Sequence, residues 1–470
     1  MELQFTQFDW LLIAAYFVLL IFLSLRKNWK SVDEESYLLS GRKITLPAFV
    51  ATLVSTWYGG ILGVGEYSYQ FGVSQWFIFG FPFYVFSILF AVFLAGKIRE
   101  NKALTIPEAI SNKYGARSGA ITSIAVFVLV SPAPYILMLG LLIQFMLGGT
   151  EHFLTYAILV ALFSVGYVSF GGFKAVVRTD MFQVILMFAG FFILAYFATQ
   201  IFGSPVMLWQ ELPDFYKDIT GGHSIQYILV WFFIALWTFV DPGFHQRAAA
   251  ARTPAIARKG IFISVFCWSI FDFFTLLTGL YGVVILSEID NPILVYPYLA
   301  NTILPIGFKG LFYLTLIATI MSTMDSFLFL SGQTLGRDLL AKYITAIDSV
   351  NLTRLCIFIS AVLAILLIYI YPSVIALWYV IGSVMIPGLL IPVLGIYIRF
   401  FSLAKEYASY ALTIPILISL IWLIAGSIAT DDLYSQSFLG IEPFYPGLLT
   451  SGVIWVVGKL KDKTEVNAKV

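Results

Sequence analysis

The sequence of 470 residues is short of charged residues, histidines and cysteines. Charged residues make up 11% of it and hydrophobic residues 60%, and the mean hydropathy is +0.92. No soluble domain of this size has so apolar a composition, so soluble enzymes and soluble binding modules are excluded. The formal net charge of +1 points to no particular partner. We expect neither a nucleic-acid partner nor an obligatory protein partner.

Residues that bind metals or carry redox chemistry are equally scarce. Cys267 and Cys356 lie inside apolar runs, where we expect a packing role and no disulfide. The three histidines, His152, His223 and His245, lie in or near predicted loops, which argues against haem ligation within a membrane. The sequence has neither a paired cysteine and histidine pattern nor a phosphate-binding glycine loop before a soluble helix. We therefore do not expect an enzyme.

Long apolar runs dominate the chain. A membrane-spanning helix needs roughly 20 apolar residues, and about thirteen such runs can be placed. The first, from Trp10 to Leu25, has no basic residue before it and no cleavage site of small residues after it, so we expect a retained span. The runs predict an all-α polytopic protein embedded in the lipid bilayer of the inner or plasma membrane. The predicted spans are 8–25, 45–64, 74–96, 119–147, 153–170, 178–202, 226–244, 260–286, 309–334, 352–371, 373–398, 408–428 and 444–458.

Basic residues concentrate in alternate loops between these spans, a pattern that marks the cytosolic side. The loops after spans one, three and seven contain, for example, Arg42, Lys97 and Arg252. The intervening loops hold acidic residues such as Glu66 and Glu211. The alternation predicts an N-terminus outside and a C-terminus in the cytoplasm, which requires an odd number of spans.

A stripe of hydroxyl side chains crosses the apolar run 310–330. Four hydroxyl residues recur at helical spacing and share one face, with Asp325 beside them. Lipid tolerates such groups poorly, so we expect this face to look onto protein or a wet cavity. Hydroxyl and carbonyl oxygens suit a small hard cation, and the stripe therefore suggests a cation site. Its members are Thr319, Ser322, Thr323 and Ser326.

Two predicted spans contain residues that interrupt helices. Span two has four glycines between Gly59 and Gly65. These glycines fit either close helix packing or an unwound segment whose carbonyls coordinate an ion. Span seven contains Asp241-Pro242-Gly243, which we expect to end that span at the cytosolic face.

The spacing of these two spans predicts an internal symmetry. Spans two and seven are five apart, so spans 2–6 and 7–11 would form two inverted five-helix units, an arrangement typical of transporters. The single transmembrane domain 1–470 then divides into four parts. These are an extra helix with a cytosolic loop at 1–44, the first repeat at 45–202, the second repeat at 226–399, and two further helices with a tail at 400–470.

Four segments carry recognisable motifs, in one order along the chain. They are YLLSGR at 37–42, GGFKAVVRTDMFQ at 171–183, Gln246-Arg247, and MSTMDS at 321–326 followed by Arg337-Asp338-Leu339. They resemble the Y-F-L-A-G-R, GG-x-x-A-V-x-x-T-D-x-x-Q, Q-R and M-S-T-x-D-S motifs of the solute:sodium symporter family. The resemblance covers about residues 37 to 340. It implies the leucine-transporter fold with thirteen spans, and coupling of solute transport to sodium.

The resemblance also implies a central sodium site between spans two and nine. Carried over by position, its ligands would be three backbone carbonyls and two hydroxyls. The carbonyls are those of Ser55, Tyr58 and Thr319, and the hydroxyls are those of Ser322 and Thr323.

The resemblance further implies a second sodium or proton site, which would consist of Asp180, Ser326 and Asp325. Two carboxylates placed close together repel each other, and a bound sodium ion or a shared proton would relieve the repulsion. Other roles stay open for both carboxylates. Asp180 would otherwise pair with Arg178 or cap its helix, and Asp325 would make a hydrogen bond between helices.

The solute is not identified by the sequence. Span four has no arginine or lysine to clamp a carboxylate, and Ile61-Leu62 lack the polar side chains that sugar carriers of the family use nearby. Both features favour a small organic solute held by aromatic residues. Asp272, deep in span eight, is a functional candidate or a partner in a hydrogen bond between helices. The expected cavity walls are Trp57, Tyr58, Gly59, Gly60, Tyr135, Trp231 and Trp237.

These observations predict a sodium-coupled symporter that imports a small organic solute by alternating access. One alternative is a proton-coupled carrier of the same fold, with Asp180 or Asp325 as the proton site. Another is a transporter-like sensor, which would require a partner because only a short tail follows Lys459. A membrane enzyme is disfavoured, because no cofactor constellation is visible in the sequence.

Overall fold

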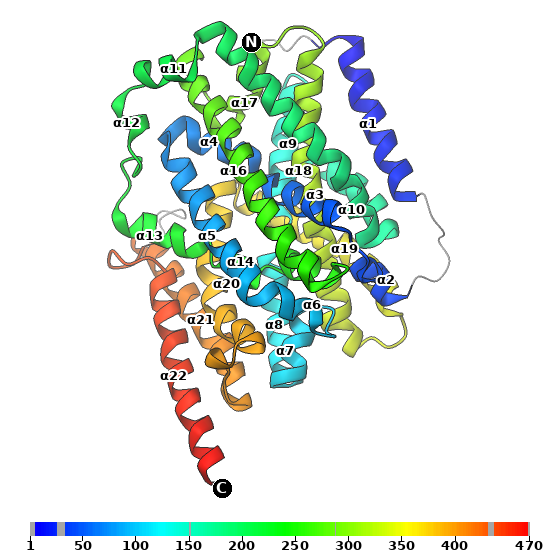
Figure 1. The fold of residues 1–470 in the computed structure, drawn as a ribbon, viewed down its shortest axis with the longest axis vertical. Helices are drawn as coiled ribbons and strands as arrows, with labels where there is room; N and C mark the ends of the chain where they lie inside the picture. Colours follow the sequence, from blue (N-terminus) through cyan, green and yellow to red (C-terminus); the bar gives the residue numbers. More distant parts are fainter. Residues whose placement is uncertain (1–4, 26–32, 150–151, 287, 431–436, 469–470) are drawn as a thin grey trace.

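The computed structural model describes residues 5–25, 33–149, 152–286, 288–430 and 437–468. Within these ranges the regular structure is helical, with two isolated β-bridges that join Ile44 to Ala251 and Phe438 to Ile441. The expected all-α fold is confirmed. The described chain begins at one end of the molecule and finishes at the opposite end (Figure 1).

The α-helices of the described chain differ widely in length, because several predicted spans are divided into shorter segments. The bounds of these helices are α1 Gln7–Leu25, α2 Glu34–Leu39, α3 Leu46–Trp57, α4 Ile61–Phe71, α5 Phe81–Phe90, α6 Gly96–Glu100, α7 Ile106–Tyr114, α8 Ala116–Leu129, α9 Ala133–Met146, α10 Phe153–Phe202, α11 Pro205–Glu211, α12 Asp214–Lys217, α13 Ile225–Ile234, α14 Trp237–Val240, α15 Pro242–Ala250, α16 Pro254–Ile285, α17 Val295–Ile303, α18 Phe308–Gln333, α19 Ser349–Ile370, α20 Val374–Tyr397, α21 Lys405–Thr430 and α22 Phe444–Ala468.

Ten helical stretches in the described part of the chain are long and apolar enough to cross a membrane. Predicted spans five and six both fall within the 50-residue helix α10. Two helices within α10 meet at Gly172, whose φ of 61° and ψ of −168° are not helical, so the predicted division into two helices is present, but without the longer loop that was expected between them. A Cβ atom there would lie 2.6 Å from the Tyr37 ring, so glycine suits both the bend and the close contact. The total of thirteen spans stays a prediction.

Both predicted helix interruptions are present in the structure. In span two, a 3₁₀ turn at Tyr58–Gly60 separates α3 from α4. In span seven, α14 ends at Val240 and a new helix, α15, begins at Pro242. The expectation that Asp-Pro-Gly ends span seven is wrong, because proline starts a helix readily at its first position and all of α15 is buried.

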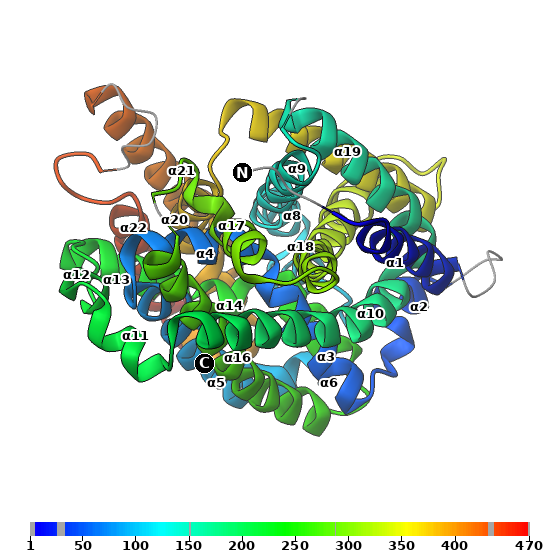
Figure 2. The same ribbon diagram turned by 90° about the horizontal axis from the view of Figure 1, so that it is seen from above.

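Helix α18 passes through the centre of the bundle (Figures 1 and 2). Every residue from Phe312 to Gln333 is buried, because α18 packs against α1, α3, α9, α10 and α19. The hydroxyl stripe therefore faces protein, as expected. Helices α21 and α22 pack on each other at one flank of the molecule, and α1 lies at the opposite flank (Figures 1 and 2).

Candidate functional site

The hydroxyl stripe of α18 meets the chain at the break in span two. Thr323 Oγ1 donates a hydrogen bond to the Thr56 carbonyl at 2.7 Å. A Cβ atom on Gly59 would lie 2.8 Å from Thr323 Cγ2 and closer still to Thr323 Cβ and Oγ1. Glycine at 59 thus lets the backbone of the 3₁₀ turn approach α18 closely.

The side chains of the other residues expected in the central site differ in their hydrogen-bond partners. Ser322 Oγ donates to Asp180 Oδ1 at 2.6 Å, and the buried Ser55 hydroxyl faces the same carboxylate. Thr319 Oγ1 donates to the Thr315 carbonyl at 2.7 Å. The Tyr58 hydroxyl donates to the Trp268 carbonyl at 3.0 Å. The side chains of Thr319 and Tyr58 are thus already hydrogen-bonded, and only their carbonyls were expected to hold an ion.

Asp180 lies beside the expected central site, and the two predicted cation sites therefore adjoin. Its carboxylate accepts hydrogen bonds from Thr52 Oγ1 at 2.5 Å and from Ser322. The open alternative that Asp180 pairs with Arg178 is wrong, since its partner is Arg247, 3.7 Å away. Asp180 is also not a helix cap, because it lies within α10.

Arg247 is a residue of the candidate site that the sequence interpretation did not place there. Its side chain is completely buried, and Nη2 donates to Thr56 Oγ1 at 2.6 Å and to Ser326 Oγ at 3.0 Å. Nε donates to Thr52 Oγ1 at 3.2 Å, and Nη1 donates to the Gly243 carbonyl at 3.3 Å. The guanidinium thus lies between two of the expected second-site ligands, Asp180 and Ser326. The Gln246-Arg247 motif was the signal in the sequence that could have pointed to Arg247. The burial of Arg247, however, depends on the new helix that begins at Pro242, which the sequence interpretation did not predict.

Asp325, the third expected second-site residue, points elsewhere. Its Oδ2 accepts a hydrogen bond from the Tyr167 hydroxyl of α10, and its buried Oδ1 has no hydrogen-bond partner. In the described part of the chain no lysine, arginine or histidine lies within ion-pair distance of it. The alternative of a hydrogen bond between helices describes this residue.

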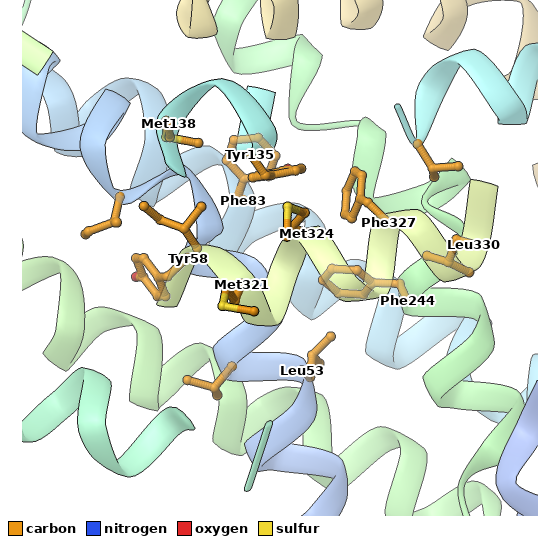
Figure 3. Packing of buried hydrophobic residues seen from close by; sticks show 14 of the residues in the cluster. Leu53, Tyr58, Phe83, Tyr135, Met138, Phe244, Met321, Met324, Phe327 and Leu330 are labelled. Carbon is orange, nitrogen blue, oxygen red and sulfur yellow. The ribbon is translucent and has the colours of Figure 1, made fainter. Parts of the chain in front are cut away.

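A cavity of about 120 Å³ adjoins the break in span two. Five of the expected wall residues line it together with Tyr58, while Gly59 faces Thr323 instead. Several aromatic residues of the lining had not been expected, and among them Trp378 packs on Gly60, where a Cβ atom would lie 2.5 Å from Trp378 Cζ2. Tyr58, Phe83, Tyr135 and Phe244 converge around Met321, Met324 and Phe327 of α18 (Figure 3). The expected wall residues that line the cavity are Trp57, Gly60, Tyr135, Trp231 and Trp237.

Asp272 of α16 also lines this cavity. Its side chain is buried, and Oδ2 accepts a hydrogen bond from the Tyr84 hydroxyl of α5. Tyr58 lines the same cavity, and its hydroxyl lies near this carboxylate while it donates to the Trp268 carbonyl. Asp272 therefore joins two helices and also reaches the cavity.

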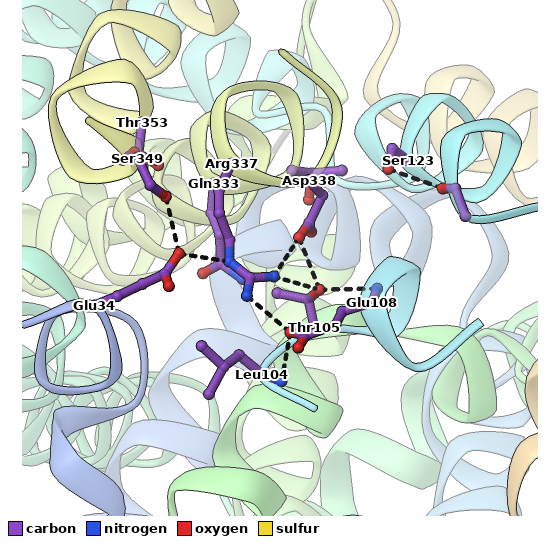
Figure 4. A network of polar contacts seen from close by, with 12 residues as sticks. Glu34, Leu104, Thr105, Glu108, Ser123, Gln333, Arg337, Asp338, Ser349 and Thr353 are labelled. Atoms are coloured by element: carbon purple, nitrogen blue, oxygen red, sulfur yellow. Dashed lines mark hydrogen bonds and ion pairs between the residues drawn. The ribbon is translucent and has the colours of Figure 1, made fainter. Parts of the chain in front are cut away.

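A charged cluster joins the segment after α18 to α2 and α7 (Figure 4). Arg337, which follows α18, pairs with Glu34 at 2.7 Å, Glu108 at 2.8 Å and Asp338 at 2.7 Å. Ser349 at the start of α19 donates to the same Glu34 at 2.8 Å. This Arg337 cluster links α2, α7 and α19 to the segment that follows α18.

Known proteins share both the sequence pattern and the fold. A model of the sodium:solute symporter family matches residues 37–422. The sodium/glucose cotransporter of Vibrio parahaemolyticus is 25% identical over 416 residues, which are 76% of this chain and 74% of that protein. The osmoregulated proline transporter OpuE of Bacillus subtilis (strain 168) is 24% identical over 383 residues, with 75% and 76% covered. The substrate-bound outward-open structure of a Na⁺-coupled sialic acid symporter aligns at a TM-score of 0.78 and 15% identity, over 97% of this chain and 98% of that chain.

Proposed function

The chain belongs to the sodium:solute symporter family, and from this premise we propose that it imports a small organic solute together with sodium by alternating access. Membership makes it an integral membrane transporter and not an enzyme, as the sequence predicted. Its leucine-transporter-like fold also agrees with the prediction. Placement in the inner or plasma membrane, with the N-terminus outside, is part of the proposal.

The observation that carries the proposal is the contact between the hydroxyl stripe of α18 and the break in span two. Thr323 reaches the Thr56 carbonyl there, and Ser322 reaches Asp180. Sodium would be held by the hydroxyls of Ser322 and Thr323 and by the carbonyls of Ser55, Tyr58 and Thr319. Both hydroxyls keep lone pairs for a cation when they donate a hydrogen bond, and oxygen donors are what a hard cation prefers.

The same break supplies both the ion site and the solute cavity, which gives a physical basis for coupling. Ser55 and Tyr58 contribute to the proposed sodium site, while Trp57, Tyr58 and Gly60 line the cavity. An ion that fixes this break orders the cavity wall, so sodium favours the conformation that binds solute. Coupling requires only that sodium binds one conformation more tightly than the other. The membrane potential would add about 2.3 kcal/mol per sodium ion per 100 mV.

A proton-coupled carrier remains the second candidate, because Asp325 is a buried carboxylate without a cationic partner in the described part of the chain. A buried carboxylate in that position is costly unless it binds a proton or a cation. Uptake into proteoliposomes that survives removal of sodium but collapses with the pH gradient would favour this candidate. Uptake that requires sodium whether or not a pH gradient is present would exclude a proton-coupled carrier.

The direct test of the sodium site is the melting temperature of the purified protein in sodium and in potassium. Sodium is expected to stabilise the wild-type protein in proportion to occupancy, and Ser322→Ala and Thr323→Ala are each expected to require more sodium. Ser451→Ala is the matched control, because Ser451 of α22 is also buried and its hydroxyl has no hydrogen-bond partner. Sodium dependence that is unchanged in both site variants would reject the assignment.

A further inference from the structure

Aromatic rings dominate the cavity next to the break in span two. Ten of its nineteen lining residues are aromatic, and each of the ten comes from a different helix or helical turn. The Trp57 ring, for example, lies 4.7 Å from Phe83, 5.3 Å from Trp268 and 5.6 Å from Phe244, measured between centroids. Aromatic faces carry partial negative charge and attract cations, most strongly where water is excluded. The ten residues are Trp57, Tyr58, Phe79, Phe83, Tyr135, Trp231, Trp237, Phe244, Phe327 and Trp378.

Among the charged residues of the lining, one carboxylate, Asp272, has no cationic partner among the described residues. Arg247 is engaged by Thr52, Thr56, Ser326, the Gly243 carbonyl and Asp180. Asp241 caps α15, and its Oδ1 accepts from the Phe244 amide at 2.8 Å. No lysine, arginine or histidine of the described residues lies within ion-pair distance of Asp272. Because Arg247 is already engaged and Asp272 is a buried carboxylate without a cationic partner among the described residues, a cationic solute would supply the positive charge that this carboxylate lacks.

The same lining argues against other solute classes. An acid would need a free cationic donor, and the guanidinium of Arg247 already makes four hydrogen bonds. A sugar would need several free hydrogen-bonding side chains. The Thr56 hydroxyl accepts from Arg247, and the Tyr58 hydroxyl donates to the Trp268 carbonyl. The lining hydroxyls of Thr56 and Tyr58 are thus occupied, and the buried Trp231 indole N–H, which has no partner, is a donor and not an acceptor.

The paucity of acceptors also restricts the kind of cation. A primary ammonium carries three N–H donors that each need an acceptor, and Asp272 is the only carboxylate of the lining that neither caps a helix nor faces Arg247. A quaternary ammonium has no donors and needs only aromatic faces and a nearby negative charge. We infer that the solute carries a methylated, preferably quaternary, ammonium group held by the aromatic walls and Asp272. This inference rests on the proposed symport function and names its substrate class.

The test measures binding of tetramethylammonium and choline to the purified full-length protein in sodium, by melting temperature and tryptophan fluorescence. The control ligand is 3,3-dimethyl-1-butanol, which has the shape of choline with carbon in place of nitrogen. We expect the two cations to bind and the neutral alcohol to bind at least roughly tenfold more weakly, the size of a desolvated cation–π contact. Equal binding of choline and the alcohol would overturn the inference.

Variants separate the two parts of the proposed site. Asp272→Asn keeps the shape and the hydrogen bond from Tyr84, and it is expected to weaken choline binding about tenfold or more while sparing the alcohol. Asp290→Asn, in the exposed loop after α16, is the matched control. Trp237→Leu tests the aromatic wall independently if Asp272→Asn does not fold, and unchanged choline binding in either folded variant would overturn the inference. Sodium-specific stabilisation without added solute reports on symport separately, so a protein that responds to sodium but binds no ammonium rejects only the substrate class.

Discussion

Replacement of Gly59 by alanine tests the contact on which the proposed sodium site depends. The added Cβ atom would lie 2.8 Å from Thr323 Cγ2 and nearer to two other atoms of Thr323. Ordinary van der Waals contact begins at about 3.4 Å, so the 3₁₀ turn and α18 would have to separate by at least roughly 0.6 Å. Binding sites require their ligands to be placed to within about 0.5 Å, and a displacement of about 1 Å costs on the order of a hundredfold. We therefore expect sodium affinity to fall about ten- to a hundredfold.

The loss can be read from sodium-dependent stabilisation of the purified protein. At a sodium concentration a hundredfold above the dissociation constant, the wild-type protein gains about 2.7 kcal/mol, and a hundredfold weaker variant gains only about 0.4 kcal/mol. Gly166→Ala is the matched control, because an added Cβ at Gly166 of α10 meets no atom within 4 Å. A sodium titration of Gly59→Ala that coincides with the wild type would refute the reasoning.

Three further predictions concern residues around this contact. Ser322→Ala is expected to raise the sodium concentration for half-maximal stabilisation about tenfold, whereas Thr319→Ala leaves it unchanged because the Thr319 hydroxyl is bonded to its own helix; equal effects in sodium titrations would contradict the assigned roles. Arg247→Gln is expected to lower the free energy of unfolding by about 3 kcal/mol or more in potassium. The loss is expected to be smaller in sodium, because the buried Asp180 carboxylate, left without its guanidinium partner, attracts a sodium ion. Equal losses in the two salts, measured by calorimetry, would show that no cation replaces the guanidinium. Arg337→Gln is expected to open its end of the bundle and to accelerate thiol labelling of Ala249→Cys in a background without native cysteines, and an unchanged labelling rate would show that the cluster does not close this end.

The large features of the fold could be predicted because each depends on a local pattern in the sequence. Apolar runs of membrane length predicted the helices, and the glycines after Tyr58 predicted the break in span two. The glycines at 171–172 marked the junction of spans five and six, although the two helices meet directly at Gly172, against Tyr37, without the longer loop that the nearby lysine and arginine suggested. Asp-Pro-Gly misled, since the same residues that end one helix can start the next.

The candidate site was predictable where one helix carries the pattern and unpredictable where distant segments meet. The hydroxyl stripe is visible in a single helical run, so its residues could be named from spacing. The contact of Arg247 with Asp180 joins residues 67 positions apart and depends on how α15 packs beneath α3. Trp378 was missed for the same reason: aromatics are common in this chain, and only its packing on Gly60 distinguishes it.

The adjacency of the two predicted cation sites changes how the second one is understood. Arg247 provides a fixed positive charge between Asp180 and Ser326, where a second sodium ion had been expected. A cation cannot share that position with a guanidinium unless Arg247 moves. We therefore expect one sodium ion, at the proposed Ser322–Thr323 site, while Arg247 keeps its present position. The ratio of charge to solute in proteoliposomes measures this number.

The central claim is that sodium and solute bind to one shared break in span two. The most direct measurement is the dissociation constant of a solute found by a thermal-shift panel, determined in sodium and in potassium for the wild type and for Ser322→Ala. The account predicts tighter binding in sodium, a reciprocal effect of solute on sodium affinity by the same factor, and loss of both in Ser322→Ala. A solute that binds equally well in sodium and in potassium would contradict it.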